Sequence, residues 1–517
     1  MIKILFIFTG LFSFMAFSSI WAQSPEAQKK PNIVLFLVDD MGWQDTSVLF
    51  WHKKTPFNER YHTPNMEKLA KQGMKFTQAY ATPICSPSRV SLLTGANAAR
   101  HRVTNWTLKK DQSQDAVDDQ LIFPQWNMNG ISPEPGIENT FVATTLPQLL
   151  KDDGYFTVHS GKAHFGAIGT PGENPLNLGF DVNIAGHAAG APESYLGTDN
   201  FGVGKPGKSI WAVPGLEKYH GKDIFLTEAI TREALLVLEP VAKKQPFFLY
   251  LSHYAVHSPI MGDKRFLQKY LDAGLDPTEA KYASMVEGMD KSLGDVLDFL
   301  EEKGIAENTI ILFMSDNGGL SAHARGGEPN THNKPLASGK GSMYEGGIRV
   351  PMLVSWPRKV VPGSQVNQYV IIEDFFPSIL EMAKIRKPEV PQEVDGLSFV
   401  PLLLKEKYQH KERALFWHYP NKWGGSGPGI GTASLVRKGD WKLIYFHKNR
   451  EFELYNVVSD IGEKKNLLRE RSKKAQQLAS LLTDHLMKTK AQMPIDKNTG
   501  KKVEYPDVAL KKELNQK

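Results

Sequence analysis

Cys85 is the only cysteine of the chain, and it lies in the segment Cys85-Ser86-Pro87-Ser88-Arg89. Pro87 suits the first position of a helix, so Cys85 would lie at the helix amino end, where peptide dipoles favour bound anions. A free cysteine is more often a buried, inert residue of the core. Taken alone, the segment leaves both interpretations open.

Polar side chains follow three apolar runs of the sequence, at residues 32–38, 247–251 and 309–314. These runs are continuous and too short for buried helices, so they predict buried parallel strands. Parallel sheets bind ligands beyond the carboxyl ends of their strands, and we therefore expect the polar residues to converge on one site. They are Asp39, Asp40, Ser252, His253, His257, Ser315, Asp316 and Asn317.

Four of these side chains offer oxygen atoms to a cation. They are those of Asp39, Asp40, Asp316 and Asn317. Singly, each also fits a turn at the end of a strand. No cysteine or histidine motif at zinc spacing accompanies them, and hard cations prefer oxygen ligands. Together they predict one hard divalent cation at the strand ends.

Helices must connect these strands, because parallel neighbours need crossover connections. Residues 282–303 give the clearest pattern, with apolar side chains on one face and Gly304 as the stop signal. Residues 66–72 and 145–153 predict shorter helices.

The pattern changes after about Leu404. Residues 433–436 and 441–446 predict a β-hairpin, residues 451–455 a further strand, and residues 472–487 a terminal helix. We therefore expect an α/β fold: a large mixed, mainly parallel sheet sandwiched by helices, with a smaller C-terminal antiparallel-sheet subdomain. The chain length of 517 residues exceeds what one hydrophobic core usually supports, so we expect two domains. The expected domains are residues 30–404 and 405–517.

The amino end predicts export. Lys3, an apolar run at residues 4–21 and the small Ala22 before Gln23 fit a signal peptide at residues 1–22. A membrane anchor is the weaker alternative, because the run contains several Ser, Thr and Gly residues. No later stretch is apolar enough to span a bilayer. We expect a periplasmic or secreted protein without stable membrane insertion after signal removal.

The charge pattern bears on the partner. A net charge of +6 is mild for this length and suits an anionic substrate, although a lysine-rich C-terminal surface explains much of it. No basic helix or aromatic-basic interleaving is present, so a nucleic acid partner is not expected.

Cys85-x-Pro87-Ser88-Arg89, with Leu93-Thr94-Gly95 downstream, resembles the signature of the formylglycine sulfatases of the alkaline phosphatase superfamily. Further blocks follow the family's order at residues 31–42, 161–166, 246–259, 315–319 and 339–351. The chain departs from the family pattern at Ala163, where Trp is usual, and at Ala96, where Arg or Lys is common. Both departures bear on substrate shape more than on the core reaction.

The resemblance implies that a maturation enzyme of the host oxidises Cys85 to formylglycine. It also implies one calcium ion, held by the four oxygen-donor residues and residue 85. Calcium is favoured over magnesium because its shell is larger and looser. The catalytic residues implied are Cys85, Arg89, Lys162, His164, His257 and Lys340, and the substrate-binding residues are Lys162, His257, Lys340, His323 and Arg325.

The expected reaction is hydrolysis of a sulfate ester of a carbohydrate, within the domain at residues 30–404. The alternatives are a phosphatase or phosphodiesterase of the same superfamily, or a non-catalytic carbohydrate-binding relative. The sequence does not identify the sugar. The long loops at residues 105–139 and 166–221 are functional segments or disordered insertions. Candidate contacts to sugar rings are Trp106, Trp126, Tyr195, Trp211, Trp417 and Tyr419, and further polar candidates are His187 and His418.

Overall fold

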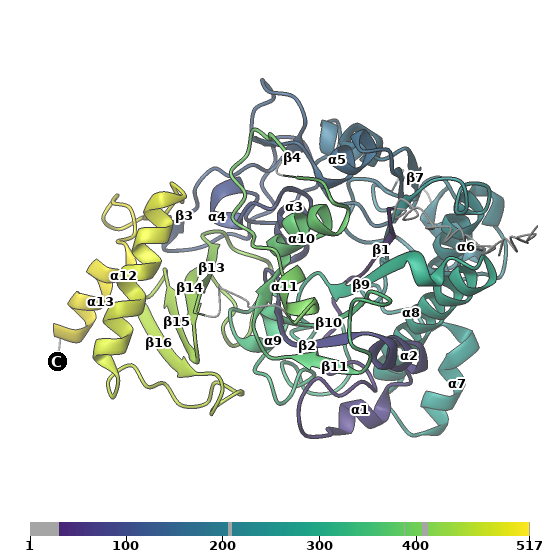
Figure 1. Ribbon diagram of the computed structural model, residues 1–517. Coiled ribbons are helices and arrows are strands. Elements are labelled where there is room, and N and C mark those ends of the chain that lie inside the picture. Colours follow the sequence, from purple (N-terminus) through teal and green to yellow (C-terminus); the bar gives the residue numbers. More distant parts are fainter. Residues whose placement is uncertain (1–29, 205–208, 387, 406–411, 516–517) are drawn as a thin grey trace, which may run out of the picture.

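A computed structural model describes residues 30–204, 209–386, 388–405 and 412–515. The strands of its central sheet are β1 (Asn32–Val38), β2 (Met74–Tyr80), β6 (Phe156–Gly161), β7 (Val182–Ile184), β8 (Phe247–Ser252), β9 (Thr309–Ser315), β10 (Arg349–Ser355), β11 (Ser364–Val366) and β12 (Val370–Ile371). Their order is β11-β2-β10-β9-β1-β8-β6-β7, and β12 pairs with β2 (Figure 1). The signal peptide predicted at residues 1–22 lies outside the described residues.

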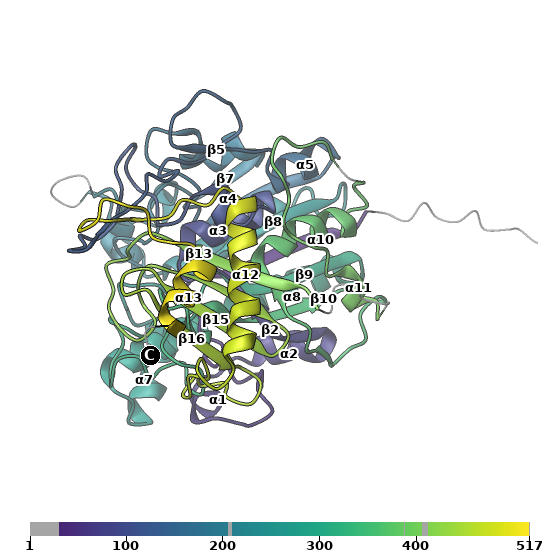
Figure 2. The ribbon, with the colours of Figure 1, turned by 90° about the vertical axis from the view of Figure 1, so that its left-hand side faces the viewer.

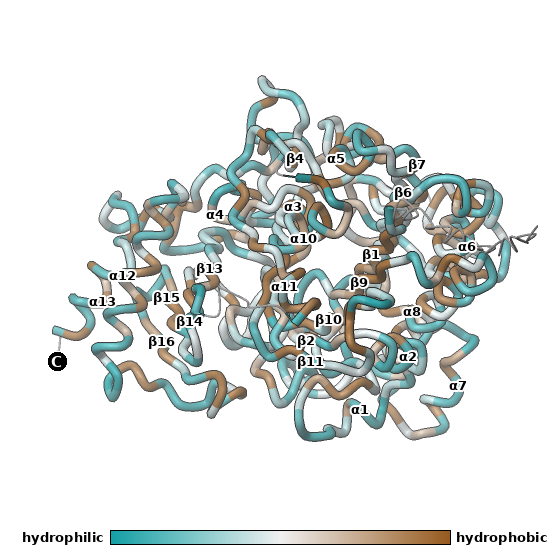
Figure 3. Tube along the Cα trace, in the orientation of Figure 1, coloured by the Kyte–Doolittle hydropathy of each residue, from teal (hydrophilic) through white to brown (hydrophobic). Residues whose placement is uncertain are grey.

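The three predicted buried strands are confirmed and are adjacent. β1 pairs in parallel with β8 on one side and with β9 on the other, and β8 continues in parallel to β6. β10 is antiparallel to both β9 and β2, so the sheet is mixed but mainly parallel, as expected. Apart from the polar Asn32 at its start, β1 is hydrophobic (Figure 3), because both of its faces are buried.

Helices cover both faces of this sheet. The helices are α1 (Pro56–Arg60), α2 (Pro64–Gln72), α3 (Cys85–Thr94), α4 (Ala98–His101), α5 (Leu146–Asp152), α6 (Leu226–Leu238), α7 (Lys264–Asp272), α8 (Pro277–Glu302), α9 (Glu345–Ile348), α10 (Phe375–Met382), α11 (Val400–Leu403), α12 (Ser472–Lys488) and α13 (Pro506–Asn515). Alternate residues of β1 enter two cores: Leu35 packs in the core that contains α3, α5 and α10, and Phe36 in the core that contains α2, α6 and α8.

The predicted helices are confirmed, with shifted ends. α8 begins at Pro277 rather than at Tyr282, because the Asp276 carboxylate caps its first turn by accepting hydrogen bonds from the backbone of Thr278 and Glu279. α13 was not predicted. It packs with α12 around Leu510, in a core that also contains residues of the small sheet.

The C-terminal region forms the expected antiparallel sheet, with order β13 (Ala414–Tyr419), β14 (Ala433–Lys438), β15 (Trp441–Phe446) and β16 (Glu451–Asn456). Leu435 and Ile444 on one face join the main core, and Val436 and Leu443 on the other pack against α12. Figure 2 shows α12 crossing this sheet. The small sheet is therefore docked on the large one through a shared core.

Buried ion pairs add to this contact. Lys442 of β15 lies 3.2 Å from Glu345 of α9 and 2.8 Å from Glu463, and all three side chains are buried.

The first long loop contains the short strands β3 (Leu121–Ile122) and β4 (Gly130–Ser132), is followed by β5 (Thr140–Val142), and is joined to the tail because β17 (Ile495–Asp496) pairs with β3. In the described part of the second long loop, β7 is accompanied by short 3-10 helices at Pro171–Glu173, Pro175–Leu178, Gly197–Gly202 and Glu217–Tyr219. In the part of the chain that the structure describes, no helix is long and apolar enough to cross a membrane.

Candidate active site

The polar residues that follow the parallel strands meet at one edge of the sheet. Asp39 and Asp40 follow β1, and Asp316 and Asn317 follow β9. Lys162 follows β6, a fourth strand that was not among the three buried strands predicted from the sequence. The strands run in one direction, so their carboxyl ends bring these side chains together.

Cys85 lies at the first turn of α3, and its side chain is buried. The helix begins at Cys85 itself, after the extended Ile84, so Pro87 occupies the third helical position rather than the first. Gly95 caps the end of α3 with a φ of +69°, and an added Cβ would lie 2.9 Å from the Phe376 ring, so glycine suits this position. The amino end of α3 thus presents Cys85 to the strand ends.

A set of oxygen atoms around Cys85 fits a cation. Ligand atoms of Asp39, Cys85 and Asp316 all lie within 4.8 Å of one another. Among the described residues, Asp39 Oδ1 and Asn317 Oδ1 are buried and accept no hydrogen bond. Buried oxygen atoms without a partner are costly, and a hard cation would satisfy them. The donor set therefore fits the predicted metal site.

Three cationic side chains compensate the three aspartates. Lys162 Nζ lies 2.6 Å from Asp39 Oδ2, and Arg89 Nε donates to Asp316 Oδ2 at 2.8 Å. Lys340 Nζ lies 2.8 Å from Asp40 Oδ1. These six side chains are almost fully buried, so the charges interact with little screening by water.

Burial and neighbouring charges shift the pKa values of two aspartates of the cluster in opposite directions. Burial raises the pKa of Asp39 well above its ordinary value; Lys162 opposes this rise, and the charges of Asp316 and Asp40 add to it. For Asp40, burial also favours the neutral acid, but Lys340 and His257 outweigh it and lower the pKa. Three carboxylates in one buried cluster repel one another, which is a further reason to expect a cation there.

Two histidines border the cluster. His164 Nε2 donates to the Thr107 carbonyl at 2.9 Å, and its ring packs on Gly190, where an added Cβ would lie 2.3 Å from the ring. His257 Nδ1 donates to the Ser258 carbonyl at 2.7 Å, and its Nε2 lies 3.6 Å from Asp40 Oδ2.

A pocket of about 160 Å³ opens above Cys85. Its lining includes five of the expected site residues, of which four are Cys85, His164, His257 and Lys340. The exposed His323 also lines it. Arg89 and Lys162 lie buried among the aspartates and do not form the pocket wall.

The structure does not support the prediction that Arg325 binds substrate. Its guanidinium is buried in an ion-pair network with Asp45 and Glu279 and lies 3.8 Å from the centre of the Tyr282 ring. A side chain with these partners stabilises the packing around α8, and Arg325 is not among the residues that line the pocket above Cys85. Sequence alone did not distinguish it from His323, only two positions away, because the turn between them is set by tertiary contacts.

Of the six aromatic residues predicted to contact sugar rings, only two line the pocket. Trp106 and Trp211 line the pocket, whereas the other four are buried elsewhere. Tyr195, for example, donates to the backbone carbonyls of Tyr254 and His257. His418 is held by Ser434 and the Gln492 carbonyl, and His187 does not line the pocket. The structure therefore does not support substrate contacts by the four buried aromatic residues or by His418.

Trp423 lines the pocket and was missed. It comes from the segment between β13 and β14, outside the large domain that the sequence predicted. The available signal was an aromatic residue within a glycine-rich loop, Trp423-Gly424-Gly425-Ser426-Gly427.

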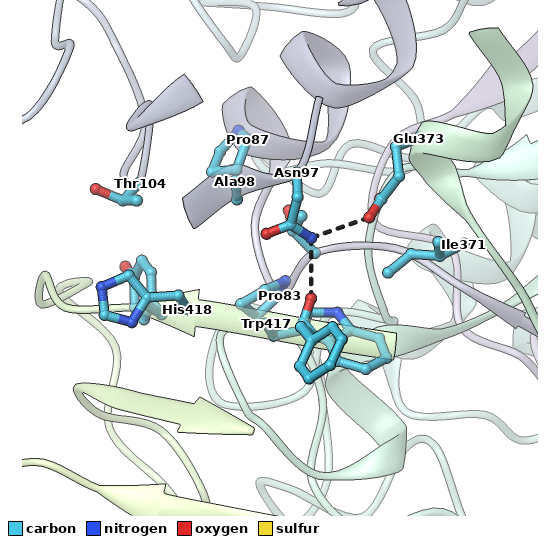
Figure 4. Close-up of a pocket in the computed structure, with 12 residues that line it drawn as sticks. Pro83, Pro87, Asn97, Ala98, Thr104, Ile371, Glu373, Trp417 and His418 are labelled. Atoms are coloured by element: carbon cyan, nitrogen blue, oxygen red, sulfur yellow. Dashed lines mark hydrogen bonds between the residues drawn. The ribbon is translucent and has the colours of Figure 1, made fainter. Parts of the chain in front are cut away.

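A second, much smaller cavity of about 10 Å³ lies behind α3, with room for about one water molecule. Figure 4 shows Asn97 pointing toward Glu373 in its wall. Asn97 Nδ2 donates to Glu373 Oε1 at 2.9 Å and to the Phe416 carbonyl at 3.0 Å. Asn97 therefore joins α4, the segment before α10 and the small sheet beneath the helix that carries Cys85.

Glu373 predicts a pH dependence of stability. Burial raises its pKa to about 8, the charge of Asp374 adds to the rise, and Asn97 opposes it. In the unfolded chain a glutamate titrates near pH 4.3. The folded state thus holds the proton more tightly, so this contribution to the free energy of unfolding is full below about pH 4 and is lost as the pH rises to about 8.

Glu373→Gln should remove that dependence. We expect the Tm of the wild type to fall relative to that of the variant between about pH 5 and pH 8, because only the wild type must bury a charge at the higher pH. Thermal unfolding across this range measures it, with the exposed Glu393→Gln as the matched control. Parallel pH curves for wild type and Glu373→Gln would contradict the assignment.

Comparisons with known proteins identify the family of the chain. The sulfatase family model matches residues 31–385, and the model for the C-terminal part of N-sulphoglucosamine sulphohydrolase matches residues 338–492. The chain is 31% identical over 545 residues to a sulfatase of Formosa agariphila, with 93% of each chain covered. It is 33% identical over 468 residues to the N-acetylgalactosamine-6-sulfatase of Mus musculus, covering 88% of this chain and 79% of the relative.

Among solved structures, that of Ps i-CgsB is similar, with a TM-score of 0.69 and 27% identity, covering 89% of this chain and 93% of the other. The family match spans more than half of the chain and contains the strand ends, Cys85 and Lys340. The chain therefore belongs to the sulfatase family, as a type I sulfatase of the alkaline phosphatase superfamily and hence a sulfuric ester hydrolase.

Proposed function

We propose that this sulfatase removes sulfate from a carbohydrate, with formylglycine at position 85 and one calcium ion. The observation that carries the proposal is the placement of Cys85: its side chain lies among buried carboxylates, at a helix amino end, beneath a pocket bordered by His257 and Lys340. A thiol in this setting has a raised pKa because it is buried, so it is a poor nucleophile as it stands. Conversion to an aldehyde would supply a different nucleophile.

The proposed reaction has three steps at residue 85: hydration, sulfuryl transfer and elimination of sulfate. The aldehyde adds water to form a geminal diol. One diol oxygen loses its proton to a carboxylate of the cluster and attacks sulfur, while the bond from sulfur to the sugar oxygen breaks and that oxygen takes up a proton. The other hydroxyl then loses its proton, the aldehyde re-forms, and the carbon–oxygen bond to the sulfate breaks. Sulfate leaves without attack of water on the sulfated enzyme. Arg89 is buried beneath Cys85 and would fix the position of residue 85 relative to the carboxylates.

The metal would be held by Asp39, Asp40, Asp316 and Asn317, together with an oxygen of residue 85. When bound, it would neutralise carboxylate charge and polarise the sulfate. The chain's own cations share that task, because Arg89, Lys162 and Lys340 already face the aspartates. A sulfate ester could then enter without an uncompensated buried charge.

The leaving sugar oxygen needs a proton. Burial and the charge of Lys340 lower the pKa of His257 to about 3, against the opposing charge of Asp40. His257 donates its Nδ1 proton to Ser258, so a neutral ring offers only a lone pair at Nε2. It can act as the acid only once protonated, which the negative charge of a bound sulfate ester would favour. Lys340 is the second candidate, since it lines the same pocket.

A carbohydrate substrate is supported by similar proteins. The mouse relative is named N-acetylgalactosamine-6-sulfatase, and one similar structure is Ps i-CgsB in complex with k-i-k-neocarrahexaose, at 26% identity and a TM-score of 0.69. Tryptophans at the pocket suit sugar rings. The proposal also includes export through residues 1–22, to the periplasm or beyond, and maturation by a formylglycine-generating enzyme.

The first prediction concerns residue 85. Protein made with a competent maturation system should carry an aldehyde there, which peptide mass spectrometry detects. Cys85→Ala should keep its Tm, because the change is small, and lose turnover. Ser91→Ala, on the same helix but outside the pocket, should stay active. Fully active enzyme with only thiol at position 85 would refute the mechanism.

The second prediction concerns the metal. Chelation should abolish turnover and calcium should restore it. Calcium at about 100 times its Kd should stabilise the wild type by about 2.7 kcal/mol, and Asp316→Ala should lose most of this gain because it removes a ligand. Calorimetric unfolding with and without calcium measures the shift. Glu373→Gln, a buried acid outside the site, should keep it, and full activity of metal-free protein would disprove the metal's role.

The third prediction tests the acid. A sugar alkoxide leaves poorly without a proton, whereas an activated phenolate leaves with little help. General acid catalysis contributes about 10²- to 10⁴-fold, so His257→Ala should lose far more kcat/KM on a sulfated sugar than on an aryl sulfate. Equal losses on both would show that His257 holds the sulfate or the fold. Lys340 and then His323 would be tested next.

A further inference from the structure

Two pairs of aromatic rings line the pocket above Cys85. Trp106 and Trp211 form one pair, with ring centres 6.2 Å apart, and Trp423 and His323 form the other, at 5.4 Å. The first pair comes from the two long loops, and Trp423 comes from the segment that joins two strands of the small sheet. His323 comes from the segment between β9 and α9, so four separate parts of the chain contribute rings to one pocket.

Trp423 is fixed against the catalytic residues. Its ring packs on Gly341 and Gly425, where an added Cβ would lie 2.2 Å and 2.4 Å from the ring. Gly341 follows Lys340, whose Nζ lies 5.8 Å from the centre of the Trp423 ring. A group held against this ring would thus lie beside Lys340.

Asp115 connects the two aromatic pairs. Its carboxylate accepts hydrogen bonds from Asn105 Nδ2 at 2.6 Å and from Asn421 Nδ2 at 2.8 Å, and Lys422 N approaches at 3.3 Å. Ala116 N donates to the Lys422 carbonyl at 2.9 Å. Asn105 and Lys422 directly precede Trp106 and Trp423 in the chain. One carboxylate thus binds the residue that precedes each tryptophan, through the side chain of Asn105 and the backbone of Lys422.

The pocket is small, about 160 Å³, against roughly 300–1,000 Å³ for typical sites of drug-sized ligands. Its described lining includes no acidic side chain, and its floor carries Cys85 and Lys340. Aromatic faces pack well against the C–H groups of a sugar ring, while the sulfate would bind the cations below. The size and lining suit one sulfated sugar ring between aromatic walls.

We propose that Trp106, Trp211 and Trp423 bind the sugar ring that carries the sulfate, and that Asp115 is a positioning residue that holds Trp106 and Trp423 in place. This rests on the proposed function, since the ring must present its sulfate to residue 85. The C-terminal subdomain then takes part in substrate selection. The aromatic walls act on the sugar and not on the sulfate.

The test separates binding of the sugar ring from binding of the sulfate group. N-acetylgalactosamine 6-sulfate is the sugar probe, and inorganic sulfate, measured as an inhibitor, probes the cationic floor alone. Trp423→Ala should raise the KM of the sugar about tenfold, equivalent to about 1.4 kcal/mol, with kcat little changed. The inhibition constant of inorganic sulfate should not move. Binding of the sugar to Cys85→Ser protein, measured by calorimetry, should weaken by the same factor when Trp423→Ala is added.

Asp115→Ala should raise the KM for the sugar in the same way, and Asp115→Asn should restore part of the loss, because the amide keeps one acceptor oxygen. Trp51→Ala and Asp119→Asn, which change the same residue types outside the pocket, are the matched controls. An unchanged KM and Kd in Trp423→Ala, or equal changes for sugar and inorganic sulfate, would overturn the proposal.

Failure of the proposed function gives a different result. If the matured wild type hydrolyses no sulfate ester, sulfated-sugar turnover is refuted, while the Kd measured with Cys85→Ser still tests the aromatic walls. Weaker binding in Trp423→Ala would support them even then, and unchanged binding would overturn them.

Discussion

Buried charge compensation at the carboxyl edge of the sheet governs the arrangement of this enzyme. Asp39, Asp40 and Asp316 are removed from water, and Arg89, Lys162 and Lys340 lie against them. Breaking one such pair leaves an uncompensated buried charge, which is strongly destabilising. The strands, α3 and the segment before α9 must therefore keep their relative positions. A cation would complete this balance, because two buried oxygen atoms of the described site accept no hydrogen bond.

The small sheet is part of the same arrangement rather than an appendage. Its inner face shares the main core, and the buried Lys442 pairs with Glu345, just after the segment that carries Lys340. Asn97 adds a contact from beneath α3 to the Phe416 carbonyl of β13. Through this docking, the loop between β13 and β14 brings Trp423 over the pocket. Substrate contacts can thus vary in loops while the charged floor stays fixed by the sheet.

Different residues of the site differed in how far the sequence could predict them. Asp39, Asp40, Asp316 and Asn317 followed recognisable buried strands, so their convergence followed from strand direction alone. Lys162 was found only by resemblance, because β6 has less apolar character than its neighbours. Arg325 was misjudged: an arginine near His323 looked available, but α8 supplies Glu279 and turns it into a buried structural residue. A sequence pattern does not report which partner arrives from a distant helix.

The sequence by itself determined three adjacent strands of the sheet, the main helices, the family and, through resemblance to that family, the charged residues of the site, because hydrophobic period and motif spacing are local properties of the chain. Tertiary structure decided the rest. It placed Cys85 in the first turn of α3, chose Trp106 and Trp211 over four other aromatic candidates, and added Trp423 from the C-terminal region. These outcomes depend on which segments pack together, and packing between distant segments leaves no periodic signal in either of them.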